Sequence, residues 1–254
     1  MLNNQVVLVS GGSNGIGADC VRQFAQQGAT VVIGYHNGHD RAQALCQSLP
    51  GQGHTVMRVP LEDSAAHEAI AQAVQKTYGR LDVLVNSAGY TRRITHNDLD
   101  TLTPELFNQL LCANAGGTFS LTRALMPLLT QSGAGLVVNV SSVSAFTGSG
   151  SNVAYCAAKA AMDTMTMALA RAFGPAVRFV CVSPASVDTG FVEGRSREEI
   201  QKKALKSPLG RLVEPNDVAL AVLACATHLK TATGTRIVID RSEEHTSELQ
   251  SHSF

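Results

Sequence analysis

The stretch Val6-Val-Leu-Val-Ser10-Gly-Gly-Ser-Asn-Gly-Ile-Gly17 leads from an apolar run into a glycine-rich turn, and a helical pattern follows it. Gly11, Gly15 and Gly17 have the spacing G-x-x-x-G-x-G. Glycine suits a turn that approaches a phosphate closely, and the N-terminus of the next helix offers N–H groups and a positive dipole end. No Gly-Lys-Ser/Thr follows, which disfavours a nucleoside-triphosphate loop. The stretch predicts dinucleotide binding, with a purely structural turn as the alternative for the glycines alone.

Short apolar runs alternate with helical patterns along the rest of the chain. The runs predict strands at 6–9, 30–33, 55–59, 83–85, 135–140, 177–182 and 236–239. The helical patterns lie at 16–27, 40–49, 64–78, 104–129, 155–173 and 216–229. Strands made almost only of Val, Ile and Leu are typical of parallel strands covered on both faces. The sequence therefore predicts an α/β fold: a single Rossmann-like, doubly wound domain with a seven-stranded parallel sheet and helices on both faces.

The composition argues against several classes of protein. The 254 residues carry 20 Lys+Arg and 20 Asp+Glu without a basic run, which argues against binding to nucleic acid. The longest apolar run is too short to cross a membrane, and the N-terminus has no signal-peptide pattern. Six separated cysteines without a CxxC pair indicate reduced thiols in a cytoplasmic protein. The histidines have no metal-ligand spacing, so we expect no metal.

Three residues have the pattern of an acid–base site. Tyr155 and Lys159 are four residues apart in a predicted helix and share one face, and Ser142 follows the apolar run 135–140. An ammonium group beside a phenol stabilises the tyrosinate and makes the phenol a usable acid or base near neutral pH. The Ser142 hydroxyl could hold a substrate oxygen. For the Tyr–Lys pair alone, helix packing is the alternative interpretation.

Together these motifs resemble the short-chain dehydrogenase/reductase family, over residues 5–240. The family's N-N-A-G element matches Asn86-Ser-Ala-Gly89, and its P-G-x-V-x-T turn matches Pro184-Ala-Ser-Val-Asp-Thr189. Residues 208–218 are similar to those of 3-oxoacyl-carrier-protein reductases. The resemblance implies hydride transfer between a nicotinamide cofactor and a carbonyl or secondary alcohol, with Tyr155 as general acid/base. It implies a catalytic tetrad in which the first residue holds a proton-relay water: Asn114, Ser142, Tyr155 and Lys159.

The resemblance also implies a set of cofactor-binding residues: Gly11, Ser13, Asn14, Gly15, Ile16, Gly17, Tyr35, His36, Asn37, Leu61, Asn86, Ala88, Gly89, Tyr155, Lys159, Pro184, Val187 and Thr189. Tyr35 stands where NAD-preferring relatives carry an acid, and His36 and Asn37 offer donors to a 2′-phosphate. Asn14 stands where NADP-preferring relatives often have Arg or Lys. We expect NADP(H) to be favoured over NAD(H). Leu61 follows a proline that replaces the family's adenine-binding Asp.

The last residues, RSEEHTSELQSHSF from Arg241, are unlike the rest of the chain. Arg241 to His252 match the translation of a widely used sequencing-library adapter. We therefore predict a domain at 1–240 and a non-native or disordered tail at 241–254, with a short native helix as the alternative. Relatives have a Gly-Gly turn and a few residues near the substrate cleft here.

Two functional alternatives to an active oxidoreductase therefore stay open. One is an enzyme impaired by its altered C-terminus, and the other is a non-catalytic dinucleotide-binding protein of the same fold. The expected partners are a small carbonyl or alcohol substrate and, from the resemblance, further copies of the chain in a tetramer or dimer. The long predicted helices at 104–129 and 155–173 would form that contact.

Overall fold

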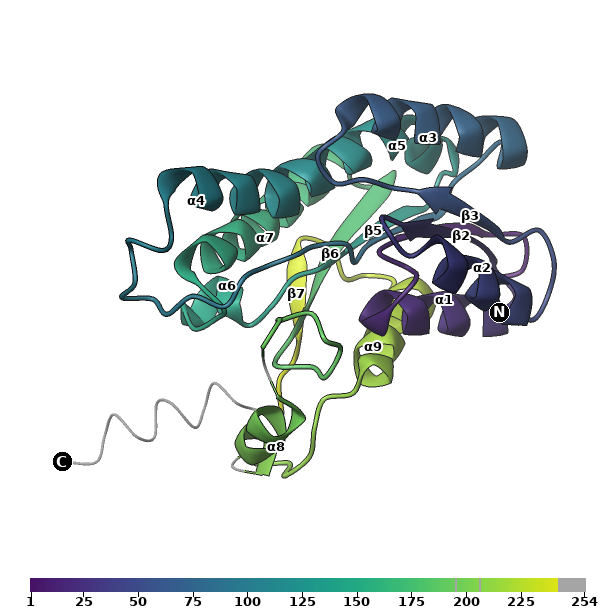
Figure 1. Cartoon of the computed structure of the whole chain (residues 1–254). Helices are drawn as coiled ribbons and strands as arrows, with labels where there is room; N and C mark the ends of the chain where they lie inside the picture. The colour runs from purple at the N-terminus through teal and green to yellow at the C-terminus, as the bar shows by residue number, and fades with distance from the viewer. Residues whose placement is uncertain (195, 206, 242–254) are drawn as a thin grey trace.

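The structure of the chain is a computed structural model that describes residues 1–194, 196–205 and 207–241 (Figure 1). Its strands form one parallel sheet in the order β3-β2-β1-β4-β5-β6-β7. The strands are β1 (Val6–Ser10), β2 (Thr30–Tyr35), β3 (Thr55–Arg58), β4 (Val83–Asn86), β5 (Gly135–Val140), β6 (Val177–Pro184) and β7 (Thr235–Ile239). They fall on the predicted apolar runs, and the predicted Rossmann-like fold is confirmed.

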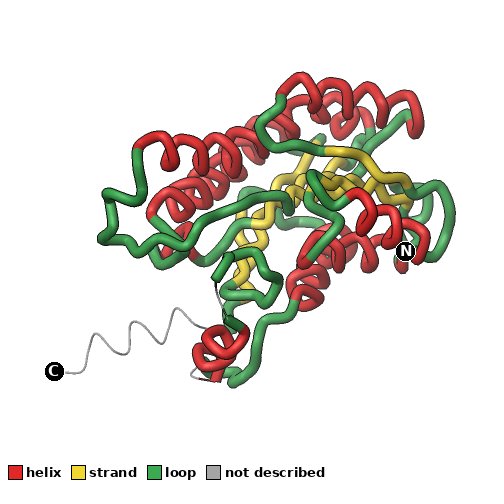
Figure 2. Tube along the Cα trace, in the orientation of Figure 1, coloured by secondary structure: helices red, strands yellow, loops and turns green. Residues whose placement is uncertain are grey.

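Helices cover both faces of this sheet (Figures 1 and 2). One face carries α1 (Gly15–Gln26), α2 (His39–Ser48) and α9 (Pro215–Thr227). The other side carries α3 (Ser64–Tyr78), α4 (Pro104–Leu111), α5 (Thr118–Gln131) and α7 (Val153–Phe173). Two short helices that the sequence patterns did not predict follow β5 and β6: α6 (Ser144–Thr147) and α8 (Arg197–Leu205).

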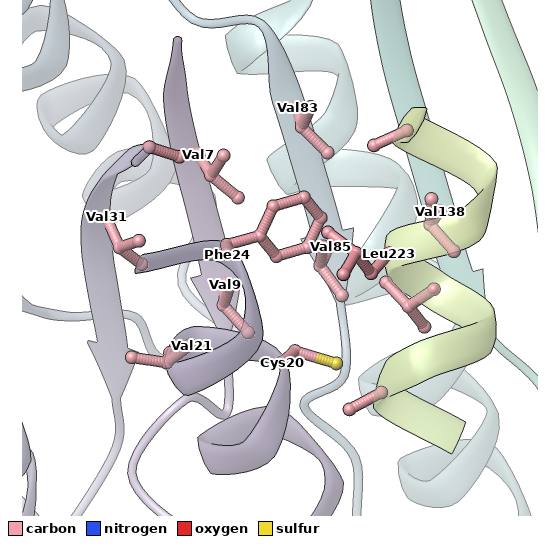
Figure 3. Packing of buried hydrophobic residues seen from close by; sticks show 14 of the residues in the cluster. Val7, Val9, Cys20, Val21, Phe24, Val31, Val83, Val85, Val138 and Leu223 are labelled. Atoms are coloured by element: carbon pink, nitrogen blue, oxygen red, sulfur yellow. The ribbon is translucent and has the colours of Figure 1, made fainter. Parts of the chain in front are cut away.

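Successive residues of β1 belong to different cores. Val7 and Val9 lie in the core beneath α1 and α9, whereas Val6 and Leu8 lie in the core with α5. Side chains of a strand alternate between its two faces, so a strand covered on both faces needs an apolar residue at every position. Figure 3 shows the first core, with the fully buried Phe24 of α1 among strand valines and near α9.

The predicted helix 104–129 is present without a break, but it is not α-helical throughout. A π-helical turn, η1 (Cys112–Gly117), separates α4 from α5. The Leu61 carbonyl oxygen packs closely against Gly117, where a Cβ atom would lie 2.2 Å from it. The backbone before α3 therefore crosses the helix at a glycine, and a wide turn of this kind is frequent at functional sites.

The described chain ends at Arg241, which has a φ of 63° and is buried. This left-handed conformation favours glycine, and the resemblance places a Gly-Gly turn at this point. The predicted tail from 242 onward lies outside the described residues, so the domain boundary at Asp240 stays a prediction. No helix in the described ranges is long and apolar enough to cross a membrane.

The first core yields a test of the packing. We expect Phe24→Ala to lower the free energy of unfolding by about 3–5 kcal/mol, because the change leaves a cavity between α1 and the sheet. Leu99→Ala is the matched control at a side chain that is 68% exposed, and its effect should stay below about 0.5 kcal/mol. Urea denaturation followed by circular dichroism measures both values. Equal losses in the two variants would contradict this view of the core.

Candidate active site

A cavity of about 920 Å³ opens at the carboxyl ends of the central strands. In this sheet β1 and β4 are neighbours whose following strands lie on opposite sides, and α/β proteins bind ligands at such a switch point. Most of the predicted site residues line this cavity: Gly11, Ser13, Asn14, Gly15, Ile16, Gly17, His36, Asn37, Leu61, Ala88, Gly89, Ser142, Tyr155, Lys159, Pro184, Val187 and Thr189. Tyr35, Asn86 and Asn114 are not among them.

The glycine turn forms one end of the cavity. Gly11 has a φ of 67°, and a Cβ atom there would lie 2.9 Å from the Ala88 backbone nitrogen. A Cβ atom on Gly17 would lie 2.2 Å from the Gly11 carbonyl oxygen. The N-cap residue of α1, Asn14, makes no side-chain capping hydrogen bond, so the first N–H groups stay available. This cradle fits the pyrophosphate of a dinucleotide.

A single hydroxyl group joins the two sides of the switch point. The backbone N–H groups of Ser87 and Ala88 both donate to Ser10 Oγ, each at 3.2 Å. Ser10 stands where the family has threonine, and the hydroxyl group is the feature that both residues share. The segment 87–89 is thereby fixed opposite the glycine turn, where both line the cavity.

The Asn86 side chain lies inside the protein, and the predicted contact of this residue with the cofactor stays a prediction. The Asn86 side chain is buried beneath the cavity, where Nδ2 donates to Asn139 Oδ1 at 2.8 Å and to Thr122 Oγ1 at 3.1 Å. It links β4 to β5 and to α5. Its contribution to the site is therefore to position the segment after β4, and it does not line the cavity.

Tyr155 and Lys159 lie on one face of α7 beside the end of β5. Lys159 Nζ lies 5.7 Å from the Tyr155 ring centroid and donates to the Val140 carbonyl oxygen at 2.8 Å. Burial lowers the pKa of the Lys159 ammonium group to about 8, against smaller opposing effects of Cys181 and Asp163. Lys159 is therefore mostly a cation at neutral pH and can stabilise a tyrosinate.

Ser142 is the third predicted catalytic residue on the cavity wall. Its Oγ accepts a hydrogen bond from the Ser144 backbone N–H at 3.1 Å and lies 3.1 Å from Ser144 Oγ. These bonds fix the hydroxyl at the start of α6. The structure thus brings Ser142, Tyr155 and Lys159 to one cavity, as the sequence patterns predicted.

Asn114 has a different place from these three residues. It is fully buried in η1, where Nδ2 donates to the carbonyl oxygens of Tyr90 and Leu110, and Oδ1 accepts from Tyr90 N. The side chain therefore holds the backbone of Tyr90, a residue that lines the cavity. The proton-relay role implied for Asn114 stays a prediction.

The adenosine end of the cavity contains a basic residue that the sequence reasoning missed. Arg41, in the first turn of α2, lines the cavity together with His36 and Asn37. A Cβ atom on Gly38 would lie 2.7 Å from Arg41 Nη2 and 2.9 Å from Ser13 Oγ, so these groups surround that glycine. The sequence signal that could have indicated Arg41 is its position in the first turn of the helix that follows the second strand.

Tyr35 is the last residue of β2, and its predicted contact with the cofactor stays a prediction. Its ring packs edge-on against His39, with centroids 5.3 Å apart, and contacts the core beneath α1. The ring is therefore part of the packing between β2 and α2. In this segment His36 is the first residue that lines the cavity.

The segment after β6 approaches Tyr155. The rings of Phe191 and Tyr155 have centroids 5.9 Å apart, and Phe191 lines the cavity. Arg93, in the segment after β4, donates to the Gly194 carbonyl oxygen at 3.0 Å. Phe191 is a further residue that the motifs did not indicate.

The comparisons with known proteins agree with this geometry. A family model described as enoyl-(acyl carrier protein) reductase matches residues 11–241. A short-chain dehydrogenase from Burkholderia cenocepacia, solved in complex with NADP, superposes with a TM-score of 0.86 and 28% identity, over 96% of this chain and 99% of that chain. The chain belongs to the short-chain dehydrogenase/reductase family.

Members of this family that resemble the chain act on different molecules. A Streptomyces violaceoruber protein named as a ketoacyl reductase of the granaticin polyketide synthase is 35% identical, over 92% of this chain and 94% of its own length. The L-fucose dehydrogenase of Bos taurus is 34% identical, over 94% and 89%. This short-chain dehydrogenase/reductase is thus an oxidoreductase of alcohol and ketone groups, and similarity at this level does not specify its substrate.

Two adjacent glycines test the cofactor end of the short-chain dehydrogenase/reductase site. Gly117→Ala should raise the Kd of NADPH about tenfold, because the new methyl group displaces the Leu61 carbonyl and with it the wall of the cavity. Gly116→Ala is the matched control, since a Cβ atom there meets nothing within 4 Å. Titration of NADPH fluorescence measures both Kd values. Unchanged binding in Gly117→Ala would show that Leu61 is not part of the adenine site.

Proposed function

We propose that the protein transfers a hydride between NADP(H) and a carbonyl or secondary alcohol, with Tyr155 as the general acid and base. The observation that carries the proposal is the arrangement of Tyr155, Lys159 and Ser142 on one wall of a cavity whose other end is the glycine cradle. A phenol beside a buried ammonium group is suited to proton transfer near neutral pH.

The residues of the chain divide the reaction between them. The bound nicotinamide supplies or accepts the hydride at the substrate carbon. In reduction, the Tyr155 hydroxyl gives its proton to the carbonyl oxygen, and Ser142 Oγ donates a hydrogen bond to that same oxygen. Lys159 stabilises the tyrosinate that remains and, as the resemblance implies, binds the nicotinamide ribose. In oxidation the tyrosinate takes the proton of the alcohol.

The preference for NADP(H) is supported by the charges of the cavity. Among the described residues that line it, none is Asp or Glu, whereas Arg41 and Lys159 are cationic. Arg41, His36 and Asn37 can all donate to an anionic group at the adenosine ribose. A 2′-phosphate would meet these donors without repulsion from a carboxylate at this position.

The proposal extends to assembly and location. As the resemblance implies, we propose a dimer or tetramer built on α4, α5 and α7. Support comes from apolar side chains left exposed on two of these helices: Phe119 on α5, and Met167 and Phe173 on α7.

We also propose a cytoplasmic location, in keeping with six cysteines that are all free thiols.

Removing the proposed acid tests the mechanism. Tyr155→Phe should lower kcat for NADPH-dependent carbonyl reduction by about 10²–10⁴-fold, because the phenylalanine ring has no proton to give. The Kd of NADPH should not change. Tyr78→Phe is the matched control on α3, remote from the cavity, and should keep its kcat. Substantial turnover by Tyr155→Phe would reject the role of this residue.

Neutralising Arg41 tests the cofactor preference. Arg41→Gln should raise the Kd of NADP about tenfold and leave that of NAD unchanged, because only NADP carries the 2′-phosphate. Arg123→Gln, at an exposed ion pair between α5 and α3, is the control. Calorimetric titration of the unchanged protein and the two variants with both cofactors gives the six Kd values that are needed. Tighter binding of NAD than of NADP by the unchanged protein would overturn the assignment.

A further inference from the structure

The catalytic face of α7 carries a third polar side chain. Asp163 lies one helical turn beyond Lys159, so Tyr155, Lys159 and Asp163 follow one another along the same face. The Asp163 side chain is 7% exposed, although carboxylates are seldom buried without partners. It lies behind the wall of the cavity and is not among the residues that line it.

Asp163 and Lys159 hold neighbouring residues at the end of β5. Lys159 Nζ donates to the Val140 carbonyl oxygen at 2.8 Å, and the Ser141 hydroxyl donates to Asp163 Oδ1 at 2.5 Å. The next residue in the chain is Ser142, whose hydroxyl faces the substrate in the proposed function. The orientation of Ser142 therefore depends on two bonds from successive turns of α7.

The other carboxylate oxygen faces a cation from the last strand. Arg236 Nε of β7 lies 3.1 Å from Asp163 Oδ2, and this ion pair makes no hydrogen bond. The Arg236 guanidinium group also stacks on the ring of Phe146 in α6, 4.3 Å from its centroid. The charged or titratable groups that face Asp163 are thus Lys159 on its own helix, Cys181 on β6 and Arg236 on β7.

The buried Asp163 carboxylate and its ion pair with Arg236 are not explained by a gain in the stability of the fold. A buried carboxylate with one oxygen lacking a hydrogen bond retains part of its desolvation cost, and apolar residues often stabilise such positions as well or better. The negative charge does, however, lie beside a buried ammonium group that must stay protonated. A buried carboxylate at position 163 is explained by two effects: it compensates the charge of Lys159, and it positions the backbone that carries Ser142.

We propose that Asp163 is a positioning residue for the reaction: its carboxylate fixes the backbone that carries Ser142 and compensates the buried charge of Lys159. The inference rests on the proposed function, in which both groups act. It adds a residue that touches neither substrate nor cofactor and acts through Ser141 and Lys159.

The two contributions have different signatures. Asp163 raises the pKa of the Lys159 ammonium group, which burial lowers to about 8, so loss of its charge lowers that pKa further. Carbonyl reduction requires Lys159 as a cation and Tyr155 as a neutral phenol. Removing a nearby negative charge favours deprotonation of both, so the alkaline limb of kcat/KM moves to lower pH. Loss of the Ser141 bond disturbs only the orientation of Ser142.

Two variants separate these contributions in the full chain. Asp163→Asn keeps an acceptor for the Ser141 hydroxyl but removes the charge, and its alkaline limb should move down by about one pH unit. Ser141→Ala keeps the charge but removes the bond, and it should lower kcat about tenfold without moving the limb. Asp19→Asn, at an exposed ion pair of α1, is the matched control and should match the unchanged protein. Thermal unfolding confirms that each variant is folded.

A second measurement does not need a substrate. The Kd of NADPH should rise as Lys159 deprotonates above pH 8, and in Asp163→Asn this rise should begin about one pH unit lower. Coincident pH profiles for Asp163→Asn and the unchanged protein, in both measurements, would overturn the role of Asp163. Failure of the proposed function has a different appearance: the unchanged protein reduces no carbonyl, or Tyr155→Phe remains active. The binding profiles then still decide the question for Asp163.

Discussion

Beyond the last ladder pair of β1 and β4, Ser10 and Asn86, one hydroxyl group holds the two chain segments together, and the site depends on that connection. Ser10 Oγ accepts the backbone N–H groups of Ser87 and Ala88, so the segment after β4 lies against the glycine turn after β1. The close approach leaves no space for a Cβ atom at Gly11. Glycine in the turn, the serine and the uncapped start of α1 are therefore parts of one constraint, which is that two chain segments must meet around a phosphate group.

The sequence predicted the features that depend on residues close together in the chain, and it did not predict those that depend on contacts between distant segments. The strands were predictable because burial on two faces requires an apolar residue at each position, and Tyr155 and Lys159 share a face because of simple helical spacing. The π-helical turn was not predictable, because it forms where the Leu61 carbonyl from a distant segment packs against Gly117. For the same reason the sequence did not show that the Asn86 side chain would hydrogen-bond to Asn139 and Thr122, or that Arg41 would line the cavity.

Cations line the cavity, and a carboxylate lies behind its wall. The described lining contains cations and no carboxylate, which suits an anionic cofactor, while Asp163 lies one layer deeper. A carboxylate on the wall would repel phosphate groups. Behind the wall it still acts on Lys159, because the intervening medium is protein and screens the charge less than water does. A carboxylate behind the wall can thus stabilise a buried ammonium group without lying beside the phosphate groups of the proposed cofactor.

The ion pair between Asp163 and Arg236 has a consequence for the order in which the site forms. A ribosome makes Tyr155, Lys159 and Asp163 well before it makes β7, which pairs with β6 only after α9 has crossed the sheet. Until then Asp163 lacks its cation, and the β6 edge of the sheet is unpaired. A nascent chain can therefore contain Tyr155, Lys159 and Asp163 before Asp163 has its ion-pair partner. The cation that compensates Asp163 is thus supplied only when β7, the last strand that the structure describes, has been synthesised.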